Sequence, residues 1–174
     1  MLKRIKETIA GICAVISLGV LAEDGSKPPV DLNTPVTNPT LTAALSRLAD
    51  NRTPENAASV RKELQKAIFL IPMLTDEFHT TPVTAEGKSI VLQNSKLKIF
   101  MLTGKDGKSY LPLFTDWEEI KKWSNRSVNT LVMPASDAWS FAIANPQYEG
   151  VVVNPGGISL PLSRNAVQQL NQAK

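Results

Sequence analysis

Residues 111–123 read Leu-Pro-Leu-Phe-Thr-Asp-Trp-Glu-Glu-Ile-Lys-Lys-Trp, and this stretch decides the fold. Its first half is apolar and follows the turn signal Asp106-Gly107, which is typical of a strand in a hairpin. Its second half opens with Thr115 and Glu118 at the spacing of a capping box, followed by an apolar helical face. A strand that runs directly into a helix predicts a domain in which helices pack on a sheet.

The chain before this stretch contains two helix patterns and several strand patterns. Each helix pattern opens with a capping residue followed by proline, at Asn38-Pro39 and at Thr53-Pro54. Apolar runs bounded by polar or turn residues indicate strands. The expected elements are helices over residues 39–50 and 54–66, strands over 67–74 and 90–92, and a hairpin of 97–102 with 110–114.

Strand and helix patterns alternate through the rest of the chain. We expect a strand over 128–133, a helix opening at Ser136-Asp137, a strand over 151–153 and a final helix that follows Ser163. The predicted fold class is therefore α/β (mixed α+β), a single domain with a mixed, largely antiparallel sheet and helices packed on it.

The N-terminus has the layout of a secretory signal. Lys3, Arg4 and Lys6 precede an apolar run over residues 9–22, and Val20-Leu21-Ala22 suits a cut before Glu23. We therefore expect export through residues 1–22, to the periplasm or the outside of the cell. The alternative is a cytoplasmic protein that keeps an uncleaved N-terminal helix. Residues 23–38 are rich in proline and predict a tether, which leaves residues 39–172 as the domain.

The charge balance argues against a nucleic-acid partner. The formal net charge is +3, but three of the 19 basic residues and one of the 16 acidic ones lie in residues 1–22, so the remainder carries only +1. The basic pairs Arg61-Lys62 and Lys121-Lys122 lie beside acidic residues in helical patterns. We expect another protein as the partner, and no stable membrane span once the signal is removed, because the apolar run is shorter than a spanning helix needs.

The sequence lacks the residues that most familiar catalytic mechanisms need. Cys13 is the only cysteine and falls in the N-terminal apolar run, and His79 is the only histidine. One histidine does not supply a usual zinc ligand set, and the Gly-x-Ser-x-Gly pattern of serine hydrolases is absent from the sequence. Asp116, Glu118 and Glu119 form an acidic group that helix capping and the helix dipole explain. We therefore expect no catalytic residue, no metal site and no cofactor.

Two short segments are candidates for binding. Asn154-Pro155-Gly156-Gly157 follows a buried strand, and its glycines permit backbone conformations that aim amides at a ligand or a partner, although a plain turn explains the same residues. Asp116 and Trp117 begin the helix after the hairpin, and tryptophan anchors either a core or a partner's pocket. The sequence does not say which of Trp117, Trp123 and Trp139 are exposed.

The blocks over residues 111–123 and 150–157, together with residues 64–72, resemble the N-terminal domain of the SseB family over about residues 39–172. The resemblance implies an α/β domain with no established enzyme activity or cofactor. The best-known members are cytoplasmic and carry a second domain, and this sequence departs from them in its N-terminal export signal.

The sequence thus favours a non-enzymatic binding or accessory module that uses Asn154, Gly156, Gly157, Asp116 and Trp117. The alternative is a hydrolase or transferase that works through carboxylates or His79 in a cleft.

Overall fold

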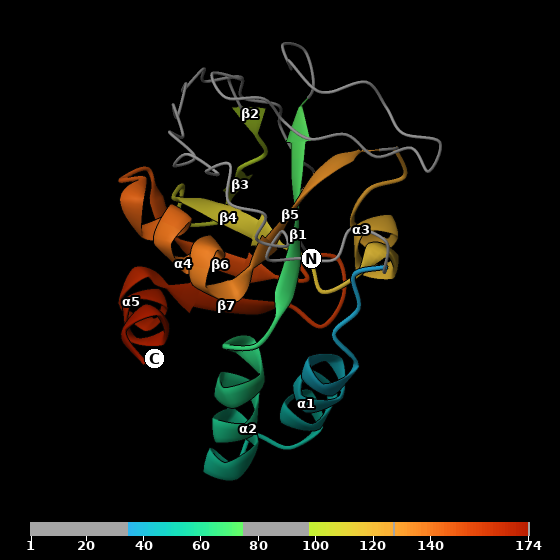
Figure 1. Ribbon diagram of the computed structural model, residues 1–174, viewed down its shortest axis with the longest axis vertical. Coiled ribbons are helices and arrows are strands. Elements are labelled where there is room, and N and C mark those ends of the chain that lie inside the picture. The colour runs from blue at the N-terminus through green and yellow to red at the C-terminus, as the bar shows by residue number, and fades with distance from the viewer. Residues whose placement is uncertain (1–34, 75–97, 127, 174) are drawn as a thin grey trace, which may run out of the picture.

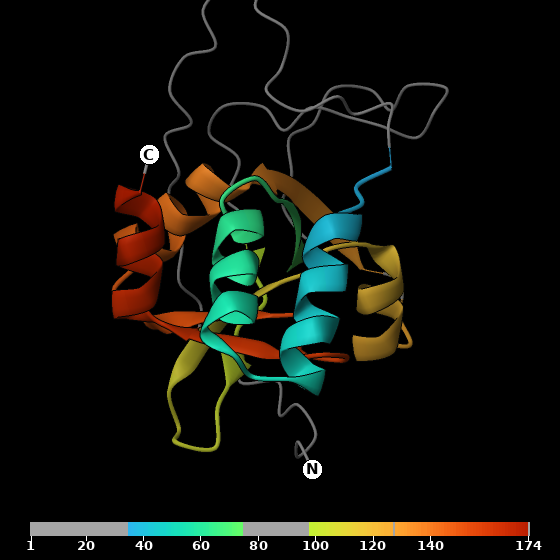
Figure 2. The same ribbon diagram turned by 90° about the horizontal axis from the view of Figure 1, so that it is seen from below.

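In the computed structural model, which describes residues 35–74, 98–126 and 128–173, two helices open the fold. Helices α1 (Pro39–Asp50) and α2 (Pro54–Leu64) lie side by side (Figure 2). Their prolines stand in the first turn, as predicted. Helix α2 ends two residues before the predicted end, and Gln65 and Lys66 form a turn that leads into the first strand.

The side chain of Asn38 bonds to distant residues instead of capping α1. Its side chain makes no capping bond. Instead its Nδ2 donates to the carbonyls of Ile68, at 2.8 Å, and Thr115, at 2.7 Å, and its Oδ1 accepts from the Ile68 N–H at 3.1 Å. Val36 packs near Leu70 and Phe114. The last residues of the predicted tether therefore contact the domain.

A three-stranded antiparallel sheet has the order β2-β1-β5 (Figure 1). Its strands are β1 (Ile68–Leu74), β2 (Lys98–Ile99) and β5 (Asn129–Pro134). A four-stranded sheet has the order β3-β4-β6-β7, with β3 (Leu102–Thr103), β4 (Ser109–Leu113), β6 (Tyr148–Val153) and β7 (Leu160–Ser163). Only the β4–β6 pair in these two sheets is parallel. The mixed α+β class and the largely antiparallel pairing are confirmed.

The two sheets meet at one point. Leu70 and Phe114 exchange backbone hydrogen bonds of 2.9 and 3.0 Å, which join β1 to the residue after β4. Both side chains are buried with Ile120 in a small apolar cluster, next to the main core. The sequence predicted one sheet, and the described residues form two because the chain uses this single bridge instead of a continuous ladder.

The predicted strand over 97–102 is wrong as one element. Ile99 pairs with Met73 in one sheet, whereas Leu102 pairs with Tyr110 in the other. Between them the Phe100 N–H donates to the Pro72 carbonyl at 3.2 Å, and the chain crosses from one sheet to the other. Apolar periodicity does not reveal that a run changes partners. The hairpin turn at residues 104–107 and the pairing of β3 with β4 agree with prediction.

Three further helices complete the fold: α3 (Trp117–Trp123), α4 (Ala135–Ala144) and α5 (Arg164–Gln172). Helix α4 starts one residue before the predicted Ser136, at the end of β5, and has no side-chain cap. The Ser163 hydroxyl caps α5 by accepting from the Ala166 N–H at 3.3 Å. The main core gathers residues of α1, α2, α4, α5 and both sheets, including Trp139, which is 1% exposed.

Within the described ranges, no helix combines the length and the apolar character needed to cross a membrane. Cys13, His79 and the predicted strand over 90–92 lie outside those ranges.

Candidate functional site

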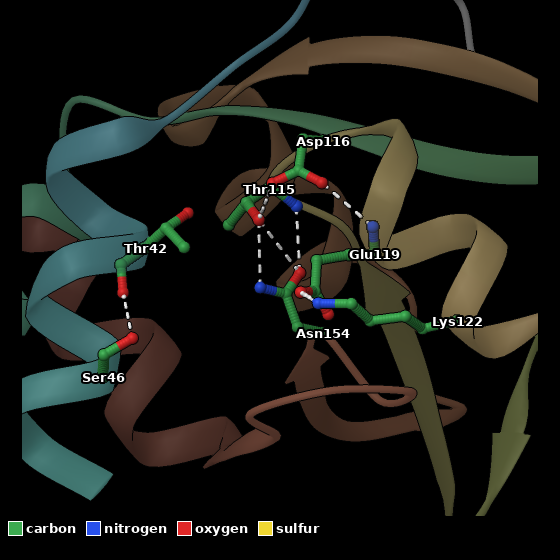
Figure 3. A network of polar contacts seen from close by, with 7 residues as sticks. All are labelled: Thr42, Ser46, Thr115, Asp116, Glu119, Lys122 and Asn154. Carbon is green, nitrogen blue, oxygen red and sulfur yellow. Dashed lines mark hydrogen bonds and ion pairs between the residues drawn. The ribbon is translucent and has the colours of Figure 1, made fainter. Parts of the chain in front are cut away.

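The two candidate binding segments are in contact, although 39 residues separate Thr115 from Asn154 (Figure 3). Strands β4 and β6 are adjacent and parallel, and Leu113 pairs with Val153 at their carboxyl ends. The residues that follow the two strands therefore emerge together. We call residues 115–123 and 154–157 the α3–turn unit.

Thr115 and Asn154 are joined by a network of hydrogen bonds. The Asn154 Oδ1 accepts from the Thr115 N–H at 3.0 Å, and the Asn154 Nδ2 donates to the Thr115 Oγ1 at 3.0 Å. Thr115 is 0% and Asn154 2% exposed. A buried amide with both ends paired stabilises the fold, since an unpaired buried polar group is costly. Both ends of the Asn154 amide are thus used in hydrogen bonds to Thr115.

The backbone of Asn154 is in the left-handed region, with φ at 51°. Asparagine tolerates this conformation better than most residues. Its N–H donates to the Leu113 carbonyl at 2.8 Å, and its carbonyl accepts from the Gly157 N–H at 3.1 Å. The predicted turn after the buried strand is therefore present, and Asn154 forms its first corner.

Asp116, and not Thr115, caps helix α3. The Asp116 Oδ1 accepts from the Glu119 N–H at 2.9 Å, while its Oδ2 accepts from the Thr115 hydroxyl at 2.9 Å. The predicted capping box of Thr115 with Glu118 is wrong because the Thr115 N–H and hydroxyl bond to Asn154 and Asp116. Glu118 is exposed and pairs with Lys121 at 2.7 Å.

Glu119 is the buried carboxylate of this unit, at 6% exposure. Its Oε1 accepts from the Lys122 Nζ at 2.6 Å, and this hydrogen bond, with the negative charge beside it, raises the pKa of Lys122. Its Oε2 is buried and has no hydrogen-bond partner among the described residues. The buried carboxylate therefore lies where α3 faces Gly157 of the turn.

The two glycines allow the turn to approach α3 closely. A Cβ on Gly156 would lie 2.6 Å from the Trp123 backbone N, and a Cβ on Gly157 would clash with the Glu119 Oε2. At Gly156 the obstacle is backbone, which leaves no room for a side chain, whereas at Gly157 it is the end of the Glu119 side chain. The predicted binding residue Gly156 therefore has a packing role that accounts for its identity, and Gly157 lies against the Glu119 carboxylate.

The three tryptophans occupy three different environments. Trp139 is buried and meets the Phe69 ring edge to face at 5.3 Å. Trp123 is half-buried, with its ring centroid 5.2 Å from that of Phe114. Trp117, in the first turn of α3, is 42% exposed. Of the predicted site residues, Trp117 has the side chain most available to a partner.

The acidic residues of this unit have structural partners. Asp116 caps the helix, Glu118 pairs with Lys121 and Glu119 pairs with Lys122. No group of histidine, cysteine and acidic side chains in the part of the chain that the structure describes could hold a metal ion.

Sequence reasoning missed the roles of Thr115, Glu119 and Lys122 in this unit. The spacing of Glu119 and Lys122, three apart in a helix, was a signal for their ion pair. The bond of Thr115 to Asn154 had no signal in the sequence, because it depends on which strands are neighbours.

A family model for the SseB protein N-terminal domain matches residues 41–169. The match spans β4, α3 and the turn after β6, and the chain belongs to the SseB family through this domain. Comparisons with curated proteins and with solved structures give no match.

Proposed function

We propose that this SseB domain is a non-enzymatic module that binds another protein, with Trp117 as the anchor of the contact surface. The observation that carries the proposal is the 42% exposure of Trp117. A tryptophan offers a large apolar face and one N–H donor, and tryptophan is among the residues enriched at the energetic centres of protein interfaces.

The setting of Trp117 supports this role. Its neighbour Asp116 caps the helix, and Ile120 is buried with Leu70 and Phe114 in the small apolar cluster of the domain. Because the backbone under Trp117 is fixed by these contacts, binding through its side chain would order little besides the side chain itself. An anchor on a rigid element is therefore consistent with a preformed contact surface.

Other exposed residues in or next to the α3–turn unit have the character of an interface. Ile158, the residue after the glycine pair, is also 42% exposed. The exposed ion pair of Lys121 with Glu118 borders the helix. Apolar contacts with charged residues at the edge are the usual anatomy of a protein interface. The small net charge of the chain favours a protein over a nucleic acid as the partner.

The alternative hydrolase or transferase receives less support. Its carboxylates in this region are those of Asp116, Glu118 and Glu119, which cap the helix or pair with lysines. An enzyme of this kind needs a carboxylate that can reach a substrate, and the unpaired Oε2 of Glu119 is buried.

Affinity purification of the tagged full chain from its own cells tests the proposal. A partner recovered with the wild type should be depleted about 30-fold with Trp117→Ala, because truncating an interface anchor costs about 2 kcal/mol. Gln147→Ala, an exposed residue just before β6, is the control outside this surface and should recover the partner normally. Equal recovery with Trp117→Ala and the wild type would contradict the proposal.

Export is a further part of the proposal and rests on residues 1–22. A mature protein outside the cytoplasm that begins at Glu23 would support it, and an intact Met1 in the cytosol would refute it. Mass spectrometry of the purified protein distinguishes the two.

A further inference from the structure

Strand β5 forms an open edge of the three-stranded sheet. It pairs with β1 on one side, and in the described part of the chain it has no strand on the other side (Figure 1). It is six residues long, Asn-Thr-Leu-Val-Met-Pro, and contains no charged residue. An uncharged edge of this length is a template for pairing with another strand.

The register with β1 identifies the backbone groups that point away from it. The Ala135 N–H donates to the Ala67 carbonyl at 2.9 Å, just after the paired residues Ile68 and Pro134. Hydrogen-bonded and non-bonded positions alternate along an antiparallel ladder, so Leu131 and Met133 bond to β1. The N–H and C=O groups of Thr130 and Val132 therefore face outward.

The other edges of the two sheets are blunted. Strands β2 and β3 have two residues each, and β3 leads into a turn with Lys105 and Asp106. Strand β7 is interrupted by Pro161, which has no N–H. Short strands, charges and proline are the usual means of preventing edge pairing. Strand β5 lacks these features until Pro134 at its end.

Both faces of β5 carry half-covered apolar side chains. Leu131 and Met133 lie at the margin of the main core, and Val128 and Val132 lie at the margin of the small cluster around Ile120. A strand that covered this edge well would also be apolar on both faces. A second β5 has that property, and its lack of charge avoids repulsion between identical strands.

We infer that two copies of this chain associate through β5, antiparallel about a two-fold axis near Leu131. In this register Thr130 of one copy and Val132 of the other exchange N–H···O=C bonds, and symmetry repeats the exchange. The Val128 N–H donates to the Pro134 carbonyl of the other copy. Proline lacks an N–H, but this bond uses only its carbonyl. On each face of the sheet, the half-covered apolar side chains of one copy then lie beside the same side chains of the other. This surface is distinct from Trp117, so the inference stands independently of the proposed function.

Sedimentation of the full chain over a concentration series tests the inference, up to about 1 mM, the weak end of specific association. The wild type should form a dimer. Thr130→Pro should raise the dimer dissociation constant at least about tenfold, because it removes an outward N–H while leaving the bonds to β1 intact. Thr130→Val keeps the N–H and should associate like the wild type.

Amide hydrogen exchange of the wild type supplies a readout that needs no variant. The amides of Thr130 and Val132 should be protected in the dimer and lose protection on dilution to the monomer. A monomer at every concentration would overturn the inference, as would a Thr130→Pro dimer of unchanged affinity. Protection of these amides in the monomer would also overturn it, since the edge would then be filled from within the chain.

Discussion

The two ends of strand β6 are each fastened by one polar side chain, but by different chemistry. At the carboxyl end, the neutral and buried Asn154 both donates to and accepts from Thr115. At the amino end, the Arg164 guanidinium donates to the backbone carbonyls of Asn145, at 3.1 Å, Tyr148, at 2.8 Å, and Ile143. Arg164 is only half-buried, and two of the carbonyls to which it donates lie at the end of α4.

The two ends of β6 should differ in how much stability they lose when the polar side chain is removed. Two of the three carbonyls bonded by Arg164 belong to the half-buried residues Ile143 and Asn145, where water can partly replace a lost donor. The Thr115 N–H is buried and has no such substitute. The carboxyl end also positions α3, which carries the exposed Trp117. We therefore expect the carboxyl end to hold the proposed contact surface in place and the amino end to contribute only to stability.

The largest effect is expected from Asn154→Ala. It leaves the buried Thr115 N–H unpaired and places alanine at positive φ, for a combined loss of about 3 kcal/mol in the free energy of unfolding. Asn154→Gly is the control: it relieves the φ strain and should lose about 2 kcal/mol. Urea denaturation measures both, and a loss under about 0.5 kcal/mol for both variants would show that the network does not matter.

Gly156→Ala should lose about 2 kcal/mol, because its Cβ would meet the backbone of Trp123 and Lys122 and push α3 away from the turn. Gly107→Ala, in the hairpin turn, is a useful comparison. There the new Cβ meets nothing within 4 Å, although its φ of 76° still strains alanine. The expected order of destabilisation is Gly156 above Gly107, and the reverse order would count against close packing of the turn on α3.

At the amino end of β6, Arg164→Ala should lower the free energy of unfolding by about 1.5 kcal/mol, through the loss of charged donors to part-buried carbonyls. Arg164→Lys should recover only part of this, since one ammonium does not reach several carbonyls in a fixed fork. A larger loss in the free energy of unfolding for Arg164→Ala than for Asn154→Ala would contradict the expected difference between the two ends.

Tyr148, the first residue of β6, gives the smallest effect. Burial raises its pKa to about 12 from 10.0. The unfolded state then loses the phenol proton before the folded state does, so stability is fully present below pH 10 and is lost as the pH rises toward 12. The loss attributable to Tyr148 should be about 1 kcal/mol at pH 11. Tyr148→Phe should remove this part of the alkaline decline, and an identical pH profile for the two proteins would contradict it.

The local features of this fold were predictable from the sequence. Proline after a capping position marks the starts of α1 and α2, and Ser163 marks the start of α5. These signals act within one turn of the chain, where steric and hydrogen-bond rules are strong. The turn after β6 was predictable for the same reason, from Asn154 and its glycines.

The contacts between distant segments were not predictable. Thr115 with Glu118 and Asp116 with Glu119 have equal capping spacing, and the choice falls to Asp116 because Asn154 bonds to the Thr115 N–H. Likewise the run over 97–102 divides between two sheets. Each outcome depends on which strands are neighbours, and a pattern within one segment does not contain that information.

Site-specific crosslinking is the most direct test of Trp117 as the contact. A photo-crosslinking amino acid would replace Trp117, the first residue of α3, and, in a separate variant, the exposed Gln147 just before β6. The account predicts a crosslinked partner from position 117, as large flat aromatic groups suit such contacts, and none from position 147. A partner captured equally at both positions, or only at 147, would contradict it.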